Sequence, residues 1–107
     1  MELYLDSANL AEIEKAFQLG FIDGLTTTPT FMHRDGITDI DATILQLAKM
    51  VPVLQVEALG KTAAEIETEA HRLLALGLDK TTTVFKIPIS LKGATACKRL
   101  ILYLIHI

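Results

Sequence analysis

The sequence predicts an α/β protein in which helices cover a parallel sheet. A short apolar run, a polar turn and a helical stretch recur four times along the 107 residues. Capping signals precede most of the helical stretches, and the connections between elements are short. Strands and helices that alternate in this way build either a doubly wound sheet or a (β/α) barrel, and ligands gather at the carboxyl ends of the strands in both.

The first unit joins a strand over Glu2–Leu5 to a helix that begins near Asn9. Asn9 is the expected N-cap, because its side chain can accept a hydrogen bond from the first helical turn, and Glu12 follows three residues later. Gly20 is expected to end this helix, since glycine readily adopts the left-handed conformation that terminates helices.

The second unit begins with a strand over Gly24–Thr28, which Pro29 ends. We expect a loop after this strand, containing the stretch HRDG (His33–Gly36). Thr38 is the expected cap of the helix that follows the loop, and Asp41 stands three residues further on.

The third strand is predicted over Val51–Glu57. The helix after it has the clearest start signal, because Thr62 and Glu65 have the spacing of a capping box. A fourth strand is expected over about Thr82–Ile87, and a last helix is expected to run from Leu91 to the end of the sequence.

Composition indicates one soluble, cytoplasmic domain over residues 1–107. The net charge of −3 gives no reason to expect a nucleic-acid or membrane partner. A single cysteine, Cys97, cannot form an internal disulfide and is expected to pack in the core. No signal peptide is recognisable at the N-terminus, and the apolar run Leu100–Ile105 is far shorter than the roughly 20 residues that span a bilayer. Three widely spaced histidines fit no metal site, and neither a metal nor a cofactor is expected.

Polar side chains recur on one face of the predicted strands. Successive strand residues point to opposite faces, so each strand has one polar-bearing face and one apolar face. If the apolar faces meet the helices, the polar side chains converge near the strand ends. These residues are Asp6, Thr26, Thr28, Gln55, Glu57 and Lys86.

Lys86 is unusual because it lies within an apolar strand, VFKIP. A lysine held between apolar neighbours loses solvation of its ammonium form, which favours the neutral and nucleophilic amine. An amine and a ketone form a Schiff base, which serves as an electron sink in aldol chemistry. Asp6 and Gln55 or Glu57 could supply the acid–base groups and the positioned water that this chemistry needs. The alternative is a structural lysine whose amine reaches solvent from the strand end.

Two motifs resemble a known family. The opening MELYLDSANLAEIEKAFQLGFIDGLTTTPT is similar to that of the small transaldolases and fructose-6-phosphate aldolases, which typically reads LDTAN, a helix and GVTTNP. VFKIPIS resembles the family's VKIP strand. The resemblance runs from residue 1 to about residue 99, and we expect the last residues, LILYLIHI, to depart from the family. It implies the N-terminal half of a barrel of eight βα units.

The resemblance also implies roles for individual residues. Lys86 would form the Schiff base, Asp6 would transfer protons, and Gln55 would orient a water, with Glu57 a weaker candidate for that role. Thr28 stands where the family has an asparagine that contacts the bound donor. The implied activity is class I aldol cleavage or transfer on sugar phosphates in carbohydrate metabolism, including the pentose phosphate route.

Four βα units imply self-association, because a half-barrel leaves two strand edges and its inner face uncovered. The apolar segment Leu100–Ile105 is expected to be buried against a partner copy. Three hypotheses for function stay open. The chain is an aldolase or transaldolase, a catalytically inactive oligomeric half-barrel with a structural role, or a sugar-phosphate binder without turnover.

Overall fold

Four strands alternate with five helices in the computed structural model, which describes residues 2–87 and 90–105. The expected last helix was taken to the end of the sequence, and its final two positions, 106–107, lie outside the described part. The elements are β1 (Tyr4–Asp6), α1 (Leu10–Phe17), β2 (Gly24–Thr27), α2 (Pro29–Arg34), α3 (Ile40–Met50), β3 (Leu54–Glu57), α4 (Ala63–Ala75), β4 (Thr83–Lys86) and α5 (Leu91–Ile105).

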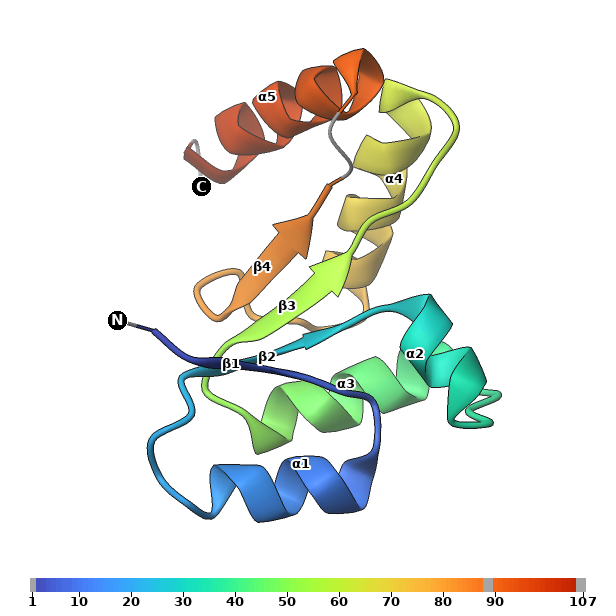
Figure 1. The fold of residues 1–107 in the computed structure, drawn as a ribbon. Helices are drawn as coiled ribbons and strands as arrows, with labels where there is room; N and C mark the ends of the chain where they lie inside the picture. The colour runs from blue at the N-terminus through green and yellow to red at the C-terminus, as the bar shows by residue number, and fades with distance from the viewer. Residues whose placement is uncertain (1, 88–89, 106–107) are drawn as a thin grey trace.

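The sheet is parallel, and its strands are in the order β1-β2-β3-β4, so each strand pairs with its neighbour along the chain. In Figure 1, α1 and α3 lie along the β1–β2 part of the sheet, α4 lies alongside β3 and β4, and α5 packs against α4. The predicted α/β class is confirmed. Consecutive parallel strands backed by helices are the arrangement of half of a (β/α)8 barrel.

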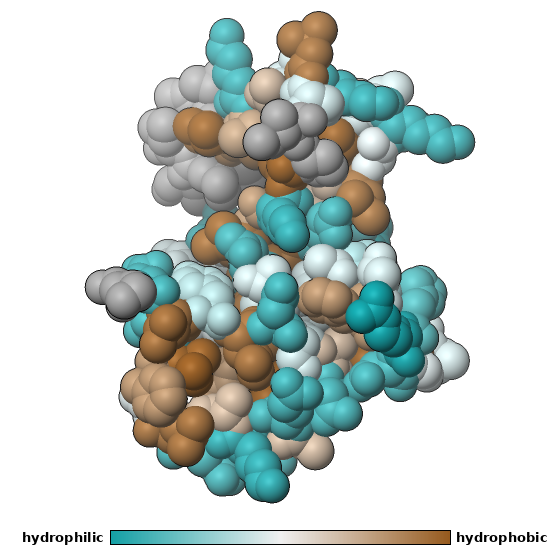
Figure 2. Space-filling model, in the orientation of Figure 1, coloured by the Kyte–Doolittle hydropathy of each residue, from teal (hydrophilic) through white to brown (hydrophobic). Residues whose placement is uncertain are grey.

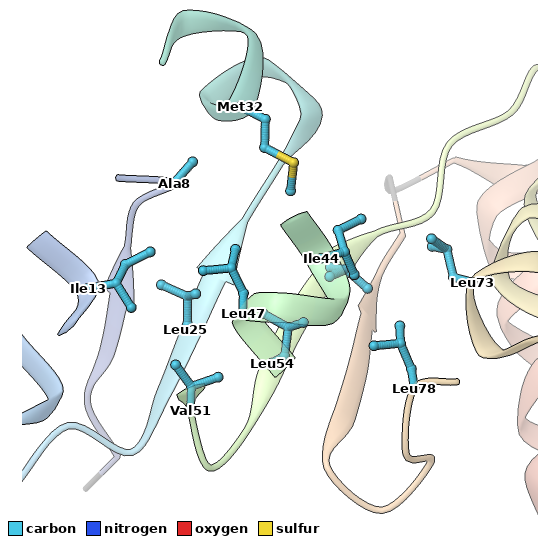
Figure 3. Packing of buried hydrophobic residues seen from close by; sticks show 11 residues of the cluster. Ala8, Ile13, Leu25, Met32, Ile44, Leu47, Val51, Leu54, Leu73 and Leu78 are labelled. Atoms are coloured by element: carbon cyan, nitrogen blue, oxygen red, sulfur yellow. The ribbon is translucent and has the colours of Figure 1, made fainter. Parts of the chain in front are cut away.

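The main core lies between the sheet and the helices (Figure 3). Strand residues with one parity, including Leu25 and Leu54, pack against Ile13 of α1 and Leu47 of α3, and all four are at most 2% exposed. Burial of each such side chain stabilises the fold by about 1.5–3 kcal/mol. A second, smaller cluster joins α4 and α5 to the β3 end of the sheet.

The caps agree with the sequence at two helices and differ at a third. Asn9 Oδ1 accepts from Glu12 N at 3.0 Å, and Thr62 Oγ1 accepts from Glu65 N at 3.1 Å, as predicted. The expectation for Thr38 was wrong, because α3 begins one residue later and Asp39 Oδ1 accepts from Ala42 N.

The expected loop after Pro29 was also wrong at its start. Residues Pro29–Arg34 form the short helix α2, which takes in half of the HRDG stretch. Its N-cap is Thr28, and proline stands at the first helical position, where its missing N–H costs no hydrogen bond. A cap followed by proline was therefore the overlooked signal for a helix.

The outer surface carries an apolar area over the connection between α1 and β2 (Figure 2). Leu3, Leu19 and Phe21 are 45%, 64% and 58% exposed there, near the amino ends of the strands. Over the described residues, no helix has the length and apolar content needed to cross a bilayer.

Candidate functional site

The strand register aligns three of the six predicted site residues across the sheet. Asp6 of β1 is in register with Thr26 of β2, and Thr26 is in register with Gln55 of β3. Val84 of β4 continues the same row. Residues in one row of a parallel sheet point to the same face, and this row alternates with the residues buried under the helices. The row therefore lies on the face of the sheet that the helices leave open.

Thr26 and Gln55 are joined by a hydrogen bond that sequence reasoning did not foresee. Thr26 Oγ1 donates to Gln55 Oε1 at 2.8 Å, and both side chains are half-buried. This bond leaves the amide nitrogen of Gln55 available to another acceptor and limits rotation of the side chain. The direct role of Thr26 in this structure is thus to orient Gln55.

Lys86 lies on the same face two residues further towards the carboxyl end of β4, in register with Glu57. Its side chain is exposed, and within residues 2–87 and 90–105 its ammonium group has no hydrogen-bond or ion-pair partner. The desolvated setting expected from the sequence is therefore not provided by the described residues. Its apolar strand neighbours, Phe85 and Val84, are half-buried and 41% exposed respectively, so the open face leaves the lysine in solvent.

Asp6 is exposed at the end of β1. It does not cap α1, because Asn9 does so, and the adjacent Ser7 instead anchors the turn through Ser7 Oγ, which accepts from Asn9 N at 3.1 Å. Among the residues that the structure describes, the carboxylate of Asp6 has no bonded partner. Its oxygens are therefore not committed to a bond within that part of the chain.

Thr28 is buried and its hydroxyl is already used. Thr28 Oγ1 accepts from Phe31 N at 3.3 Å as the N-cap of α2, with the backbone extended at φ −135° and ψ 158°. This extended backbone is the conformation that a residue before proline favours. A hydroxyl held by the helix is poorly placed to bind a donor substrate.

The predicted site residues do not yet surround a substrate. Asp6 and Lys86 lie three strand spacings apart, about 14 Å across a flat sheet. A groove of about 630 Å³ lies between α1 and α3 and is lined by residues such as Leu10, Phe17 and Met50, away from the strand ends. The described residues thus supply one wall of a site, open towards the barrel axis.

A charged cluster lies behind this wall, between α3 and α4. Arg72 donates from Nη1 to Asp41 Oδ2 and from Nη2 to Glu69 Oε1, each at 2.7 Å. These bonds lower the pKa of the Asp41 carboxyl below its ordinary value and raise the pKa of Arg72 further above its usual range. The cluster ties the two helices together on the outer side of the sheet.

Comparison with known proteins gives a consistent match. Residues 3–107 match the family model described as Transaldolase/Fructose-6-phosphate aldolase. The match continues through residue 107, so the expectation that resemblance would stop near Arg99 was wrong.

Curated relatives point the same way. "Probable transaldolase 2" of Bacillus cereus is 35% identical over 106 residues, which cover 94% of this chain and 47% of the relative. "Probable transaldolase" of Maridesulfovibrio salexigens is 35% identical, with 94% and 45% covered. "Probable transaldolase" of Thermoplasma volcanium is 34% identical, again with 94% and 45% covered. The chain spans about half the length of the curated relatives it matches.

Proposed function

This chain belongs to the transaldolase/fructose-6-phosphate aldolase family, and from that premise we propose that it carries the lysine half of a class I aldol site for phosphorylated ketoses. The observation that supports this most directly is the shared row of Asp6, Thr26 and Gln55 on the open face of the sheet, with Lys86 one row beyond. Polar groups at the carboxyl ends of parallel strands are where barrel enzymes bind substrates.

The proposed chemistry begins at Lys86. Its neutral amine adds to the ketone carbon of the substrate, and the adduct takes up one proton and loses water to give a protonated imine. The bond between the carbons α and β to the imine then breaks, and its electron pair moves towards the imine to form an enamine. The proton of the hydroxyl on the β carbon passes to Asp6, and that carbon leaves as an aldehyde. Gln55 would hold the water through which protons move, with its amide oriented by Thr26.

Borohydride trapping tests this proposal. The protein is incubated with dihydroxyacetone or fructose 6-phosphate, reduced, and mapped by mass spectrometry. We expect an adduct on Lys86 that disappears in Lys86→Arg and persists in Lys49→Arg, a matched control on the exposed side of α3. A folded protein with no adduct, or with adducts spread equally over its exposed lysines, would instead favour a half-barrel without catalytic activity.

We further propose that the site is completed by self-association. Within the described residues, β1 and β4 each have a neighbouring strand on one side only. Both edges run in the same direction, so a second copy related by a twofold axis along the strands can pair its β1 with β4. The open face also exposes Tyr4 and Val84, 37% and 41% accessible, which such a copy would cover.

Light scattering at micromolar concentration measures this association directly. A dimer or larger assembly is expected, because unpaired edges and an uncovered face favour contact with another copy. A strictly monomeric protein at that concentration would contradict self-association while leaving the lysine chemistry to be judged by trapping.

A further inference from the structure

Thr27 is the buried polar residue for which the fold offers no partner. Its side chain is 1% exposed, and its Oγ1 has no hydrogen-bond partner among the described residues. Thr27 is in register with Val56, so it belongs to the helix-facing side of the sheet rather than to the open face. Buried hydroxyls normally form hydrogen bonds, because a buried hydroxyl without a partner loses its bonds to water and gains none in the protein, which destabilises the fold.

Thr27 also lines a small cavity. It has a volume of about 40 Å³ and lies between the carboxyl end of β2 and the helices α2, α3 and α4. Met32, Ile44 and Leu73 form its apolar walls, and Thr27 contributes its side of the lining. One ordered water needs about 10–15 Å³ of such volume, so the cavity can hold water but not a sugar phosphate.

Part of the lining is charged. Asp41, Glu57, Glu69 and Arg72 all contribute to the cavity wall. Arg72 uses four of the five N–H groups of its guanidinium on Asp41 and Glu69, and it retains one donor on Nη1. Carboxylate oxygens accept several hydrogen bonds each, so the cluster offers both acceptors and a donor to a molecule in the cavity.

We propose that an ordered water occupies this cavity and bonds Thr27 Oγ1 to the cluster of Asp41, Glu69 and Arg72. Water suits the site because it donates and accepts at once, which a threonine hydroxyl facing carboxylates and a guanidinium requires. A buried water is stable when it has two to four polar partners, and this cavity supplies them. A metal ion is less suited, since the arginine already binds both of these carboxylates.

Such a water adds a link between β2 and two helices that the ion pair already joins. It would tie the end of β2 to the ion pair that joins α3 with α4. Thr27 stands between Thr26, which orients Gln55, and Thr28, which caps α2. Thr27 would therefore act as a positioning residue that holds the strand end carrying two predicted site residues.

The stability of two Thr27 variants distinguishes a cavity that holds a water from a dry one. Thr27→Val keeps the shape and removes the hydroxyl, while Thr27→Ser keeps the hydroxyl. With the water present, we expect urea titration to show a folding equilibrium constant about five-fold lower in Thr27→Val, with Thr27→Ser between it and the wild type. A dry cavity predicts that Thr27→Val is as stable as the wild type or more stable, which would overturn the proposal.

A high-resolution crystal structure of the unaltered chain provides the second test, and it is informative even if a variant fails to fold. We expect density for a water within hydrogen-bond distance of Thr27 Oγ1 and of at least one charged side chain of the cluster. An empty cavity, or a direct bond from the Thr27 hydroxyl to protein, would refute the assignment.

Discussion

Thr28 occupies the position at which the resemblance places a substrate-binding asparagine, and its hydroxyl is bonded to the backbone of α2. This position thus caps a helix, and the resemblance implies that it also contacts a substrate. Threonine satisfies the first requirement. An asparagine could satisfy both, because its amide has an oxygen for the cap and a nitrogen for a ligand.

Thr28→Asn should therefore raise the yield of the Lys86 adduct without loss of stability. Asparagine is at least as good an N-cap as threonine, so the urea midpoint is expected to stay the same. Thr28→Ala is the matched control, and it should lower stability by about 1 kcal/mol through loss of the cap. An unchanged adduct yield in Thr28→Asn would show that this position does not limit donor binding.

The bond between Thr26 and Gln55 leads to a second prediction for a single residue. Thr26→Val removes the donor to Gln55 Oε1 and frees the amide to rotate. We expect adduct formation at Lys86 to slow by about ten-fold or more, since misplaced groups transfer protons poorly. Thr26→Ser retains the hydroxyl and should retain most of the rate; equal slowing in both variants would assign Thr26 a packing role instead.

Sequence parity predicted the faces of these residues, because alternation is a property of any strand. Asp6, Thr26 and Gln55 follow it and lie in one row. The exposure of Lys86 could not be predicted in the same way. Burial on the open face depends on whatever lies across it, and the apolar neighbours of a lysine along its strand do not supply that cover.

At the scale of elements, Gly24 determines how closely β1 and β2 approach. A Cβ at this position would lie 2.5 Å from Tyr4 Cε2 and 2.9 Å from Val53 O. Gly24→Ala should destabilise the protein by about 1–3 kcal/mol, as overpacking does. The double variant Gly24→Ala/Tyr4→Ala separates the two contacts in a denaturant titration. Full recovery would locate the strain in the ring, and persistent loss would locate it at the Val53 carbonyl.

The ion pair between α3 and α4 predicts a pH dependence. The pKa of Asp41 is lowered by its hydrogen bond from Arg72, so its contribution is complete above about pH 4 and is lost as the pH falls through the folded-state pKa. Both side chains are more than 40% exposed, which limits the effect. We expect Asp41→Asn to cost about 0.5–1 kcal/mol at pH 7 and nothing at low pH, measured by urea unfolding.

Asp35→Asn is the control for this titration, because Asp35 is an exposed aspartate at the end of α2. Its stability should follow that of the wild type at every pH. A loss for Asp41→Asn that persists below pH 3 would attribute the effect to helix packing rather than to charge.

Helix existence was easier to predict than helix boundaries. Asn9 and Thr62 precede long amphipathic stretches, so local pattern and cap agree there. At α3 two possible caps stand next to each other, and the tertiary position of Ile40 against the core favours Asp39. The helix α2 has only six residues, too few for apolar periodicity to reveal it.

For the whole molecule, the free edge of β4 provides the test of self-association. Leu54 N donates to Thr82 O and Ala58 N donates to Lys86 O, so even-numbered β4 residues face β3 and Thr83 faces away. Thr83→Pro removes an N–H from that outer edge only. We expect it to shift the protein towards monomer in light scattering with its circular dichroism unchanged. An unaltered assembly would place the contact elsewhere, for instance at the apolar area of Leu19 and Phe21.

The overall architecture followed from alternation and short connections, yet those features could not separate an open sheet from a barrel. The strand order separates them here. Each of the four described strands lies beside the next one in the chain, as in a barrel, and their order does not reverse as it does in a doubly wound sheet. Pairing order is a long-range property that no local pattern of residues contains.

That consecutive order has a consequence for how the chain is made. A ribosome releases β1, α1 and β2 before any later strand exists, and those elements already form a complete pairing unit. Each further strand then pairs with the edge of the strand made just before it, so synthesis and assembly of the sheet proceed in the same direction.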